Sequence, residues 1–377
     1  MSQKRYIFEE VEAKTSTAPA TGVIDRGRRD ARRAIRAWLA ALFALVVVMI
    51  AVGGLTRLTD SGLSITEWNL VTGALPPLDA AAWEAEFAKY REIPEFQLEN
   101  ANMTLAEFKT IYWWEWGHRQ LGRVIGLVWA AGFLFFWLAR RLPAGWPARL
   151  VLLGALGGLQ GAIGWWMVSS GLTGTMVDVA SYRLAIHLGL AFVILGLIAW
   201  YHLRLARPDR EVMQARRARE PRLMRLGGAL AVLAFVQILL GALVAGIDAG
   251  RGYTDWPLMA GGLLPPDMWH LDPAWRNLFE NDGTVQFMHR LAAYLLLLAG
   301  LFVWTRARRS AHTATRRAFD WALVAIFGQA VIGIGTVMYS APVALALIHQ
   351  LGAVLAWVVI LRARFAAQYP LAQSVRG

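Results

Sequence analysis

Four of the seven histidines in this 377-residue chain occupy matching places in an internal repeat. His118 and His289 are each followed by an arginine at the start of one apolar stretch, and His187 and His349 each follow an isoleucine at the start of another. Neutral imidazole is the commonest metal ligand, and side chains from facing helices build metal sites inside helical bundles. We therefore expect two pairs of metal-binding histidines, one in each half of the chain.

The absence of cysteine from the sequence narrows the choice of metal. It excludes iron–sulfur clusters, zinc–thiolate sites, disulfides and thiol nucleophiles. Two facing imidazoles can bind both axial positions of a haem iron, whereas zinc requires a third or fourth ligand, so the pairs favour one bis-histidine haem in each half. The alternative is that each histidine only hydrogen-bonds a neighbouring membrane helix. His202, His270 and His312 have no partner in the repeat, and we expect them at interfaces or in solvent.

The two halves differ just before their first histidine. Glu115 lies three residues before His118 and on the same helical face, whereas Gln286 occupies the equivalent place before His289. A carboxylate beside a haem can take a proton, orient water or stabilise a cationic intermediate. This assigns the chemistry to the N-terminal half and cofactor binding to the C-terminal half. The alternative is that Glu115 is simply an interfacial acid near a helix start.

Three arginines lie near the same histidines, namely Arg119, Arg123 and Arg290. Their guanidinium groups could pair with the two propionates of a haem, or they could extend to the lipid interface instead. Gln160 and Gln329 recur within two glycine-rich stretches. We expect those stretches to allow close helix packing, and we favour a structural role for both glutamines.

The elements that must position these residues are membrane helices. Hydrophobic residues make up 57% of the chain against 17% charged residues, with a mean hydropathy of +0.42, which nearly excludes a water-soluble fold. A membrane span needs roughly 20 apolar residues. Eight stretches qualify, at 36–56, 118–139, 150–170, 184–203, 226–247, 286–305, 318–338 and 342–361. The chain is therefore predicted to be an all-α integral membrane protein with eight transmembrane helices.

The net charge of +12 has a topological explanation. Arginines gather before span 1, between spans 2 and 3, 4 and 5, and 6 and 7, and after span 8, whereas acids dominate the loops after spans 1 and 5. Positively charged loops stay in the cytoplasm. Both termini are thus expected to be cytoplasmic, with the histidines toward the opposite, periplasmic face of the inner membrane. The charge gives no reason to expect nucleic acid as a partner.

The spans fall into two similar sets of four. The loops after spans 1 and 5 share the pattern that begins at Trp68 and Trp256 and ends in a pair of prolines, and the four histidines repeat in register. An even number of spans per repeat gives both copies one orientation, related by an axis along the membrane normal. We expect two tandem pseudo-symmetric four-helix bundles. The predicted divisions are a basic tail at 1–35, bundles at 36–205 and 226–365, an arginine-rich linker at 206–225 and a tail at 366–377, with residues 1 to about 30 disordered.

The long loop after span 1 contains two local helix signals. Trp83, Phe87 and Tyr90 recur at helical spacing, which predicts a short amphipathic helix at the membrane interface, placed to cap the site. Thr104 and Glu107 form a capping-box pattern, so a helix should start near Leu105 and continue into span 2.

Several motifs together resemble one family. They are Gly53-Gly54-Leu55-Thr56-Arg57 and its continuation to Ser64, Glu115-Trp116-Gly117-His118-Arg119, the stretch from Gln160 to Val168, and Ile348-His349-Gln350. Across residues 36–362 the chain resembles haem A synthases, in the cysteine-free subgroup of alphaproteobacteria and mitochondria.

The resemblance implies an oxidoreductase that hydroxylates a methyl group of haem O twice, with the resulting gem-diol losing water to leave the formyl group of haem A. Glu115, His118 and His187 match the family's substrate-side residues, and His289 and His349 match the ligands of its haem b. The implied partners are haem O synthase and the cytochrome oxidase assembly pathway, within the lipid bilayer, with a homo-oligomer possible. Two other functions stay open from the residues alone: a dihaem electron carrier of the cytochrome b type, and a transporter.

Overall fold

The computed structural model describes residues 23–372 of the chain, and within them the fold is all-α. Eight of the described helices are long and apolar enough to cross a bilayer, which confirms the eight predicted spans. They are α1 (Val23–Leu58), α4 (Leu105–Leu138), α5 (Pro147–Val168), α6 (Ser181–Leu205), α8 (Pro221–Gly246), α10 (Asp282–Ala307), α11 (Thr313–Met338) and α12 (Val343–Gln368).

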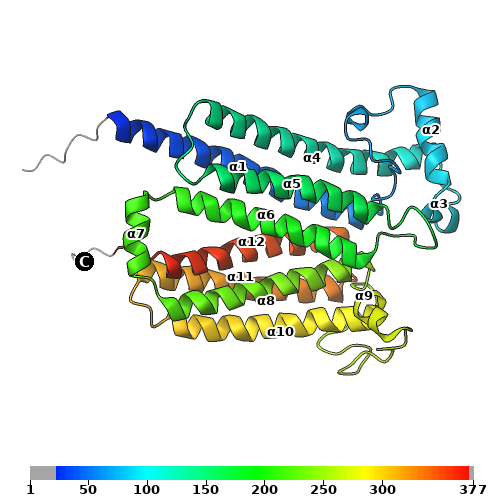
Figure 1. Ribbon diagram of the computed structural model, residues 1–377. Helices are drawn as coiled ribbons and strands as arrows, with labels where there is room; N and C mark the ends of the chain where they lie inside the picture. The colour runs from blue at the N-terminus through cyan, green and yellow to red at the C-terminus, as the bar shows by residue number, and fades with distance from the viewer. Residues whose placement is uncertain (1–22, 373–377) are drawn as a thin grey trace, which may run out of the picture.

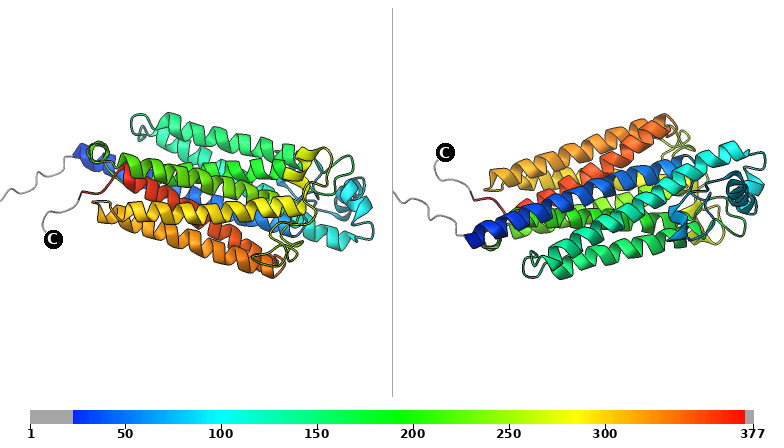
Figure 2. Two further views of the ribbon diagram at one scale, coloured as in Figure 1. Left: turned by 90° about the horizontal axis from the view of Figure 1, so that it is seen from below. Right: turned by 90° about the horizontal axis from the view of Figure 1, so that it is seen from above.

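The eight long helices lie side by side, and the loops gather at the two ends (Figures 1 and 2). One end, which we call the inner end, holds the start of α1, the end of α12 and the short helix α7 (Asp209–Arg217). The other end, which we call the outer end, holds α2 (Ala80–Arg91), α3 (Pro94–Leu98) and α9 (Asn277–Glu280). Helices α4, α6, α10 and α12 all begin at the outer end. The repeated histidine lies in the second turn of α6, α10 and α12 and several turns into the longer α4.

The same neighbour relations occur in both halves. In the N-terminal half α1 and α5 each pack against α4 and α6, and in the C-terminal half α8 and α11 each pack against α10 and α12. The halves meet where α6 and α1 contact α8 and α12. Two four-helix groups therefore stand side by side as expected from the repeat, while their relation by an axis along the membrane normal stays a prediction.

Helix α1 begins earlier than expected. We expected disorder to about residue 30, but helix is already present from Val23, and residues 1–22 lie outside the described part of the chain. Arginine and alanine are good helix formers, so the polar segment extends the apolar span without a break. Ala31, Ile35 and Leu39 are buried at helical spacing, which packs the first turns against the protein.

The outer layer over the N-terminal half is built on aromatic packing. Trp83, Phe87 and Tyr90 lie on the predicted helix, α2, and all three are buried. The rings of Trp83 and Phe87 each lie 5.0 Å from a ring of α4, those of Tyr112 and Phe108. The expected helix is confirmed, but its apolar face is covered by protein and is not free for the membrane interface.

The predicted capping box sets where α4 begins. The Oγ1 atom of Thr104 accepts from the backbone N–H of Glu107, and the Glu107 carboxylate accepts from the backbone N–H of Thr104. Helix α4 therefore starts at Leu105 and extends well beyond the apolar span, where it contacts α2.

Within this layer, Glu95 on α3 should make stability depend on pH. Its side chain is buried and its Oε2 atom has no hydrogen-bond partner. Burial, together with the nearby carboxylates of Asp178 and Glu115, raises the pKa of Glu95 from 4.5 to about 8. Between those values the folded chain holds a proton that the unfolded chain has lost, so stability falls as pH rises from about 4.5 to about 8.

Glu95→Gln should remove most of this decline, because the amide resembles the protonated acid and cannot ionise. The variant and the wild type should melt alike in detergent at pH 5, and the variant should be more stable at pH 8, by on the order of 2–4 kcal/mol. Glu99→Gln, an exposed acid beside the same helix, is the matched control. An equal loss of stability from pH 5 to pH 8 in wild type and Glu95→Gln would contradict the argument.

Candidate functional site

Each of the four repeated histidines packs against a glycine on a neighbouring helix. A Cβ atom at Gly333, Gly164 or Gly241 would lie 2.8, 2.9 or 3.0 Å from Cε1 of His349, His187 or His289, respectively. A Cβ at Gly53 would lie 3.4 Å from Cε1 of His118. The glycines come from α1, α5, α8 and α11 and the histidines from α4, α6, α10 and α12. Glycine at these places gives the imidazole rings the room they need between helices.

Three glutamines hold three of these histidines. The Nε2 atoms of Gln160, Gln237 and Gln329 donate to the backbone carbonyl oxygens of His187, His289 and His349, at 2.9, 3.1 and 2.7 Å. The same nitrogens lie 3.1–3.2 Å from Nδ1 of those rings. Each glutamine lies four residues, or one helical turn, before the glycine that its histidine contacts. The hydrogen bond thus fixes the backbone of each of these three histidines, and the glycine contact packs its ring.

Sequence reasoning found only part of this set. It recognised Gln160 and Gln329 because they repeat between equivalent spans, and it missed Gln237 on α8. The sequence does contain a pattern that marks Gln237: like Gln160 and Gln329, it lies four residues before a glycine.

The C-terminal pair has the separation expected for haem ligands. The ring centroids of His289 and His349 lie 6.4 Å apart, with an angle of 81° between the ring planes. Metal–imidazole bonds are about 2.0–2.1 Å long, so two rings that bind one metal from opposite sides should have centroids roughly 6–6.5 Å apart. Among the described residues no group of three or more histidine or acidic side chains is placed to hold a metal ion. The pair fits a haem, whose porphyrin supplies the remaining ligands.

Glu115 is buried beside the N-terminal pair and its carboxylate is fully hydrogen-bonded. Its side chain is 3% exposed. Its Oε2 atom accepts from the hydroxyl of Ser64 at 2.7 Å and from the backbone N–H of Ile65 at 2.8 Å, and its Oε1 atom accepts from Arg119 at 2.6 Å. The acid therefore joins α4 to the loop after α1, with its charge balanced by one guanidinium.

In the C-terminal half an amide replaces this acid. Gln286 is buried, and its Nε2 atom donates to the backbone carbonyl of Ala249 in the loop after α8, at 2.6 Å. Glu115 and Gln286 thus hold equivalent loops, but only Glu115 brings a charge to its site.

The three predicted arginines all reach the outer loops. Arg119 donates to the backbone carbonyls of Ile65 and Glu67, Arg123 to those of Asn69 and Leu70, and Arg290 to those of Tyr253, Asp255 and Leu258. Their partners are protein atoms, so their main role in the structure is not contact with lipid.

A cavity of about 320 Å³ lies beside these arginines in each half. Arg119 and Arg123 line the first cavity, and Arg290 lines the second. One nitrogen of an arginine that lines each cavity is buried without a hydrogen-bond partner. These nitrogens are Nη1 of Arg123 and Nε of Arg290. Buried donors without partners are costly, so these fit an anionic ligand group such as a carboxylate.

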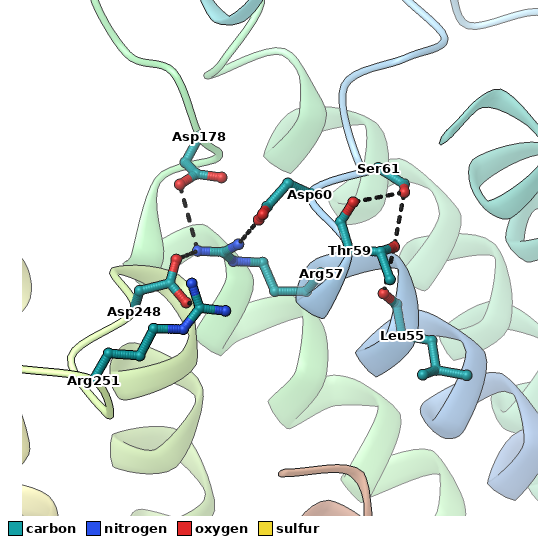
Figure 3. A network of polar contacts seen from close by, with 8 residues as sticks. All are labelled: Leu55, Arg57, Thr59, Asp60, Ser61, Asp178, Asp248 and Arg251. Carbon is teal, nitrogen blue, oxygen red and sulfur yellow. Dashed lines mark hydrogen bonds and ion pairs between the residues drawn. The ribbon is translucent and has the colours of Figure 1, made fainter. Parts of the chain in front are cut away.

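Sequence reasoning missed a cluster of charges that joins the halves, centred on Arg57 (Figure 3). The Arg57 guanidinium lies near the end of α1 and is 10% exposed. It contacts the carboxylates of Asp60, Asp248 and Asp178 at 2.6, 2.8 and 3.4 Å. Asp248 follows α8, so one cation links the outer ends of the N-terminal and C-terminal helix groups.

Arg57→Gln should loosen this junction, because Asp60 and Asp178 lose their cation and Asp248 keeps only the contact of 3.6 Å with Arg251. Those carboxylates are 36–56% exposed, so water and salt screen part of their repulsion, and we expect a loss of about 1–2 kcal/mol. The check is the melting temperature in detergent at low and high salt. Replacing Glu84, an exposed acid on α2, with Gln serves as the control. An unchanged melting temperature for Arg57→Gln would refute the linking role.

The other histidines lie elsewhere, as expected. His202 hydrogen-bonds Arg36 at the inner end, His270 hydrogen-bonds Asn281 in an outer loop, and His312 precedes the first turn of α11. None of the three takes part in the glycine and glutamine contacts described above.

Comparison with known proteins relates the chain to one family. A family model described as cytochrome oxidase assembly protein matches residues 36–361. The chain is 67% identical to a haem A synthase of Dinoroseobacter shibae, over 100% of this chain and 99% of the relative. It is 63% identical to a haem A synthase of Ruegeria pomeroyi, over 100% of both chains, and 60% identical to one of Paracoccus denitrificans, over 99% of both. The matched region includes all four repeated histidines.

Proposed function

This chain belongs to the haem A synthase family of cytochrome oxidase assembly proteins, and from that premise we propose that it oxidises the methyl substituent of haem O to the formyl group of haem A. The conversion of a methyl to a formyl group removes four electrons from one carbon. Two successive hydroxylations, each passing two electrons to an external oxidant, followed by loss of water account for it. The observation that carries the proposal is the coexistence of two histidine pairs with an acid beside only one of them, Glu115.

We assign His289 and His349 to a resident haem b. Their ring separation and the two glutamines that hold their backbones support this assignment. When bound, such a haem supplies a one-electron redox centre next to the substrate half. The Arg290 donors at the adjacent cavity would face its propionates.

We assign His118 and His187 to the iron of the substrate, haem O, with Arg119 and Arg123 near its propionates. Both rings belong to the half that holds Glu115. In this assignment Arg119 pairs with a propionate and also balances the charge of Glu115.

Glu115 is the proposed catalytic residue. Oxidation of a C–H bond releases protons, and a buried carboxylate next to the pair can accept one, whereas an amide cannot. The Ser64 hydroxyl and the Ile65 N–H orient the carboxylate, and the Arg119 guanidinium keeps its charge compensated in the resting protein. Because both carboxylate oxygens are engaged, proton uptake requires one of these bonds to weaken.

We further propose a location and partners. Eight membrane-spanning helices make this a multi-pass membrane protein; the arginine-rich loops support cytoplasmic termini and sites toward the periplasmic side of the inner membrane. Haem O synthase would supply the substrate and cytochrome oxidase assembly would use the product. Self-association into a homo-oligomer belongs to the same proposal.

The experiment that tests this assignment is to identify the haems that purified protein contains after expression with a source of haem O. A synthase should carry haem b together with haem O or haem A, and His118→Ala or His187→Ala should lose the latter while keeping haem b. Haem b in both halves, with available haem O left unconverted, would support a dihaem electron carrier and overturn the proposal. A protein without haem would indicate a transporter.

A further inference from the structure

His118 lacks the glutamine that holds the other three repeated histidines. Gly53 contacts His118 as the other glycines contact their histidines, yet the residue one turn before Gly53 is Met49. The terminal methyl of Met49 lies 3.6 Å from the Cβ position of Gly122, one turn beyond His118 on α4. Methionine has no hydrogen-bond donor. Within residues 23–372, no side chain forms a hydrogen bond with the His118 imidazole.

The His118 ring is also set differently against its glycine. At the three histidines with a glutamine, the glycine Cβ position is nearest Cε1 and next nearest Nδ1. At His118 it is equally far, 3.4 Å, from Cε1 and Nε2, and the contact is looser. The missing glutamine therefore coincides with a different ring orientation and with weaker packing.

We propose that this difference decides which haem the protein keeps and which it exchanges: Gln237 and Gln329 fix both ligands of the C-terminal pair, whereas Met49 leaves His118 free to release its iron. Gln160 still fixes His187, so release in the N-terminal half begins at His118. The identity of the exchanged haem, haem O entering and haem A leaving, rests on the proposed function.

The two haem sites have opposite requirements. A cofactor site gains from ligands that stay oriented, and losing a group that orients a metal ligand typically costs about 10–100-fold in metal affinity. A substrate site has to release its product in every cycle, so a ligand held at full strength would slow turnover. Differences in affinity between related sites arise mostly from the dissociation rate.

The test is the rate at which haem b leaves the full-length protein. Purified protein in detergent is loaded with haemin in both halves, and transfer to excess apomyoglobin is followed by absorbance. The wild type should release haem in a fast phase from the N-terminal half and a slow phase from the C-terminal half. Gln237→Met should accelerate the slow phase about 10–100-fold, and Met49→Gln should slow the fast phase by a similar factor.

Matched controls place the same side chains on the same helices but outside the site. Val236→Met on α8 and Val48→Gln on α1 both change exposed positions next to the tested residues, and their release rates should equal those of the wild type. Two variants with opposite expected effects keep the test decisive if one of them folds poorly. Unchanged phases in folded Gln237→Met, or an acceleration no greater than in Val236→Met, would overturn the inference.

The result is separable from the proposed function because it needs no turnover. If the two rates shift as expected but haem O is never converted, the glutamines still set haem retention and the proposed chemistry is wrong. If haem A is formed but the rates do not shift, the inference fails and the chemistry stands.

Discussion

Replacing either His289 or His349 with alanine should remove bound haem b and abolish haem A formation together. In our proposal the two rings bind one iron from opposite sides, which their separation of 6.4 Å fits, and alanine would leave that iron with a single protein ligand. We expect the haem b content of the purified variant to fall at least about tenfold and product to fall to the background of membranes without the protein. The measurements are haem content by the pyridine haemochrome method and chromatography of extracted haems.

The control for this prediction is His202→Ala. This histidine contacts Arg36 near the inner end, away from both pairs, so the variant should keep haem b and activity. Normal haem b content in folded His289→Ala or His349→Ala would contradict the assignment of this pair.

The second large effect is expected for Glu115→Gln, which should keep haem b but lose haem A formation. The amide preserves size, and Gln286 in the other half shows that an amide at this place can bond the following loop. It cannot accept a proton or balance the charge of Arg119. Removing a general acid or base typically costs about 10²–10⁴-fold in rate, and we expect a loss of that order. Product per haem b is the quantity to measure.

Two further variants separate the chemistry of Glu115 from its hold on the loop. Ser64→Ala removes one hydrogen bond to the carboxylate but no charge, so it should reduce product formation far less. Glu107→Gln, in the exposed capping box of the same helix, should leave it nearly unchanged. Wild-type product formation in Glu115→Gln would refute the catalytic role.

The parts of the fold that local sequence determines were predictable. The spans follow from hydropathy, and the start of α4 follows from the capping box of Thr104 and Glu107. The four histidines could be grouped because they repeat in register, and the side of the membrane that they share follows from the even number of helices in each half.

The parts that depend on contacts between distant segments were not predictable. Gln237 shares the glutamine–glycine spacing of Gln160 and Gln329, but it bonds a histidine 52 residues away, so its partner could be found only by knowing which helix faces which. The cluster at Arg57 joins α1 to Asp178 and Asp248, and no spacing in the sequence relates these residues. The outer helix α2 was recognised from its pattern, but whether lipid or protein covers its apolar face depends on the fold of α4.

The repeat explains why the asymmetries carry the function. Both halves have the same neighbour relations and pack a glycine against each repeated histidine, so we infer that a difference in task comes from individual substitutions. Two such differences are Glu115 against Gln286 and Met49 against Gln237. In our proposal, both differences assign the chemistry and haem exchange to the N-terminal half and the permanently bound haem to the C-terminal half.

The central claim is best tested by expressing the chain in membranes that contain a source of haem O but no other haem A synthase, then extracting the haems and separating them by chromatography and mass. Our account predicts haem A above the level in membranes without the protein, and none with Glu115→Gln despite normal haem b. Bound haem b with haem O left entirely unconverted by the wild-type chain would contradict it.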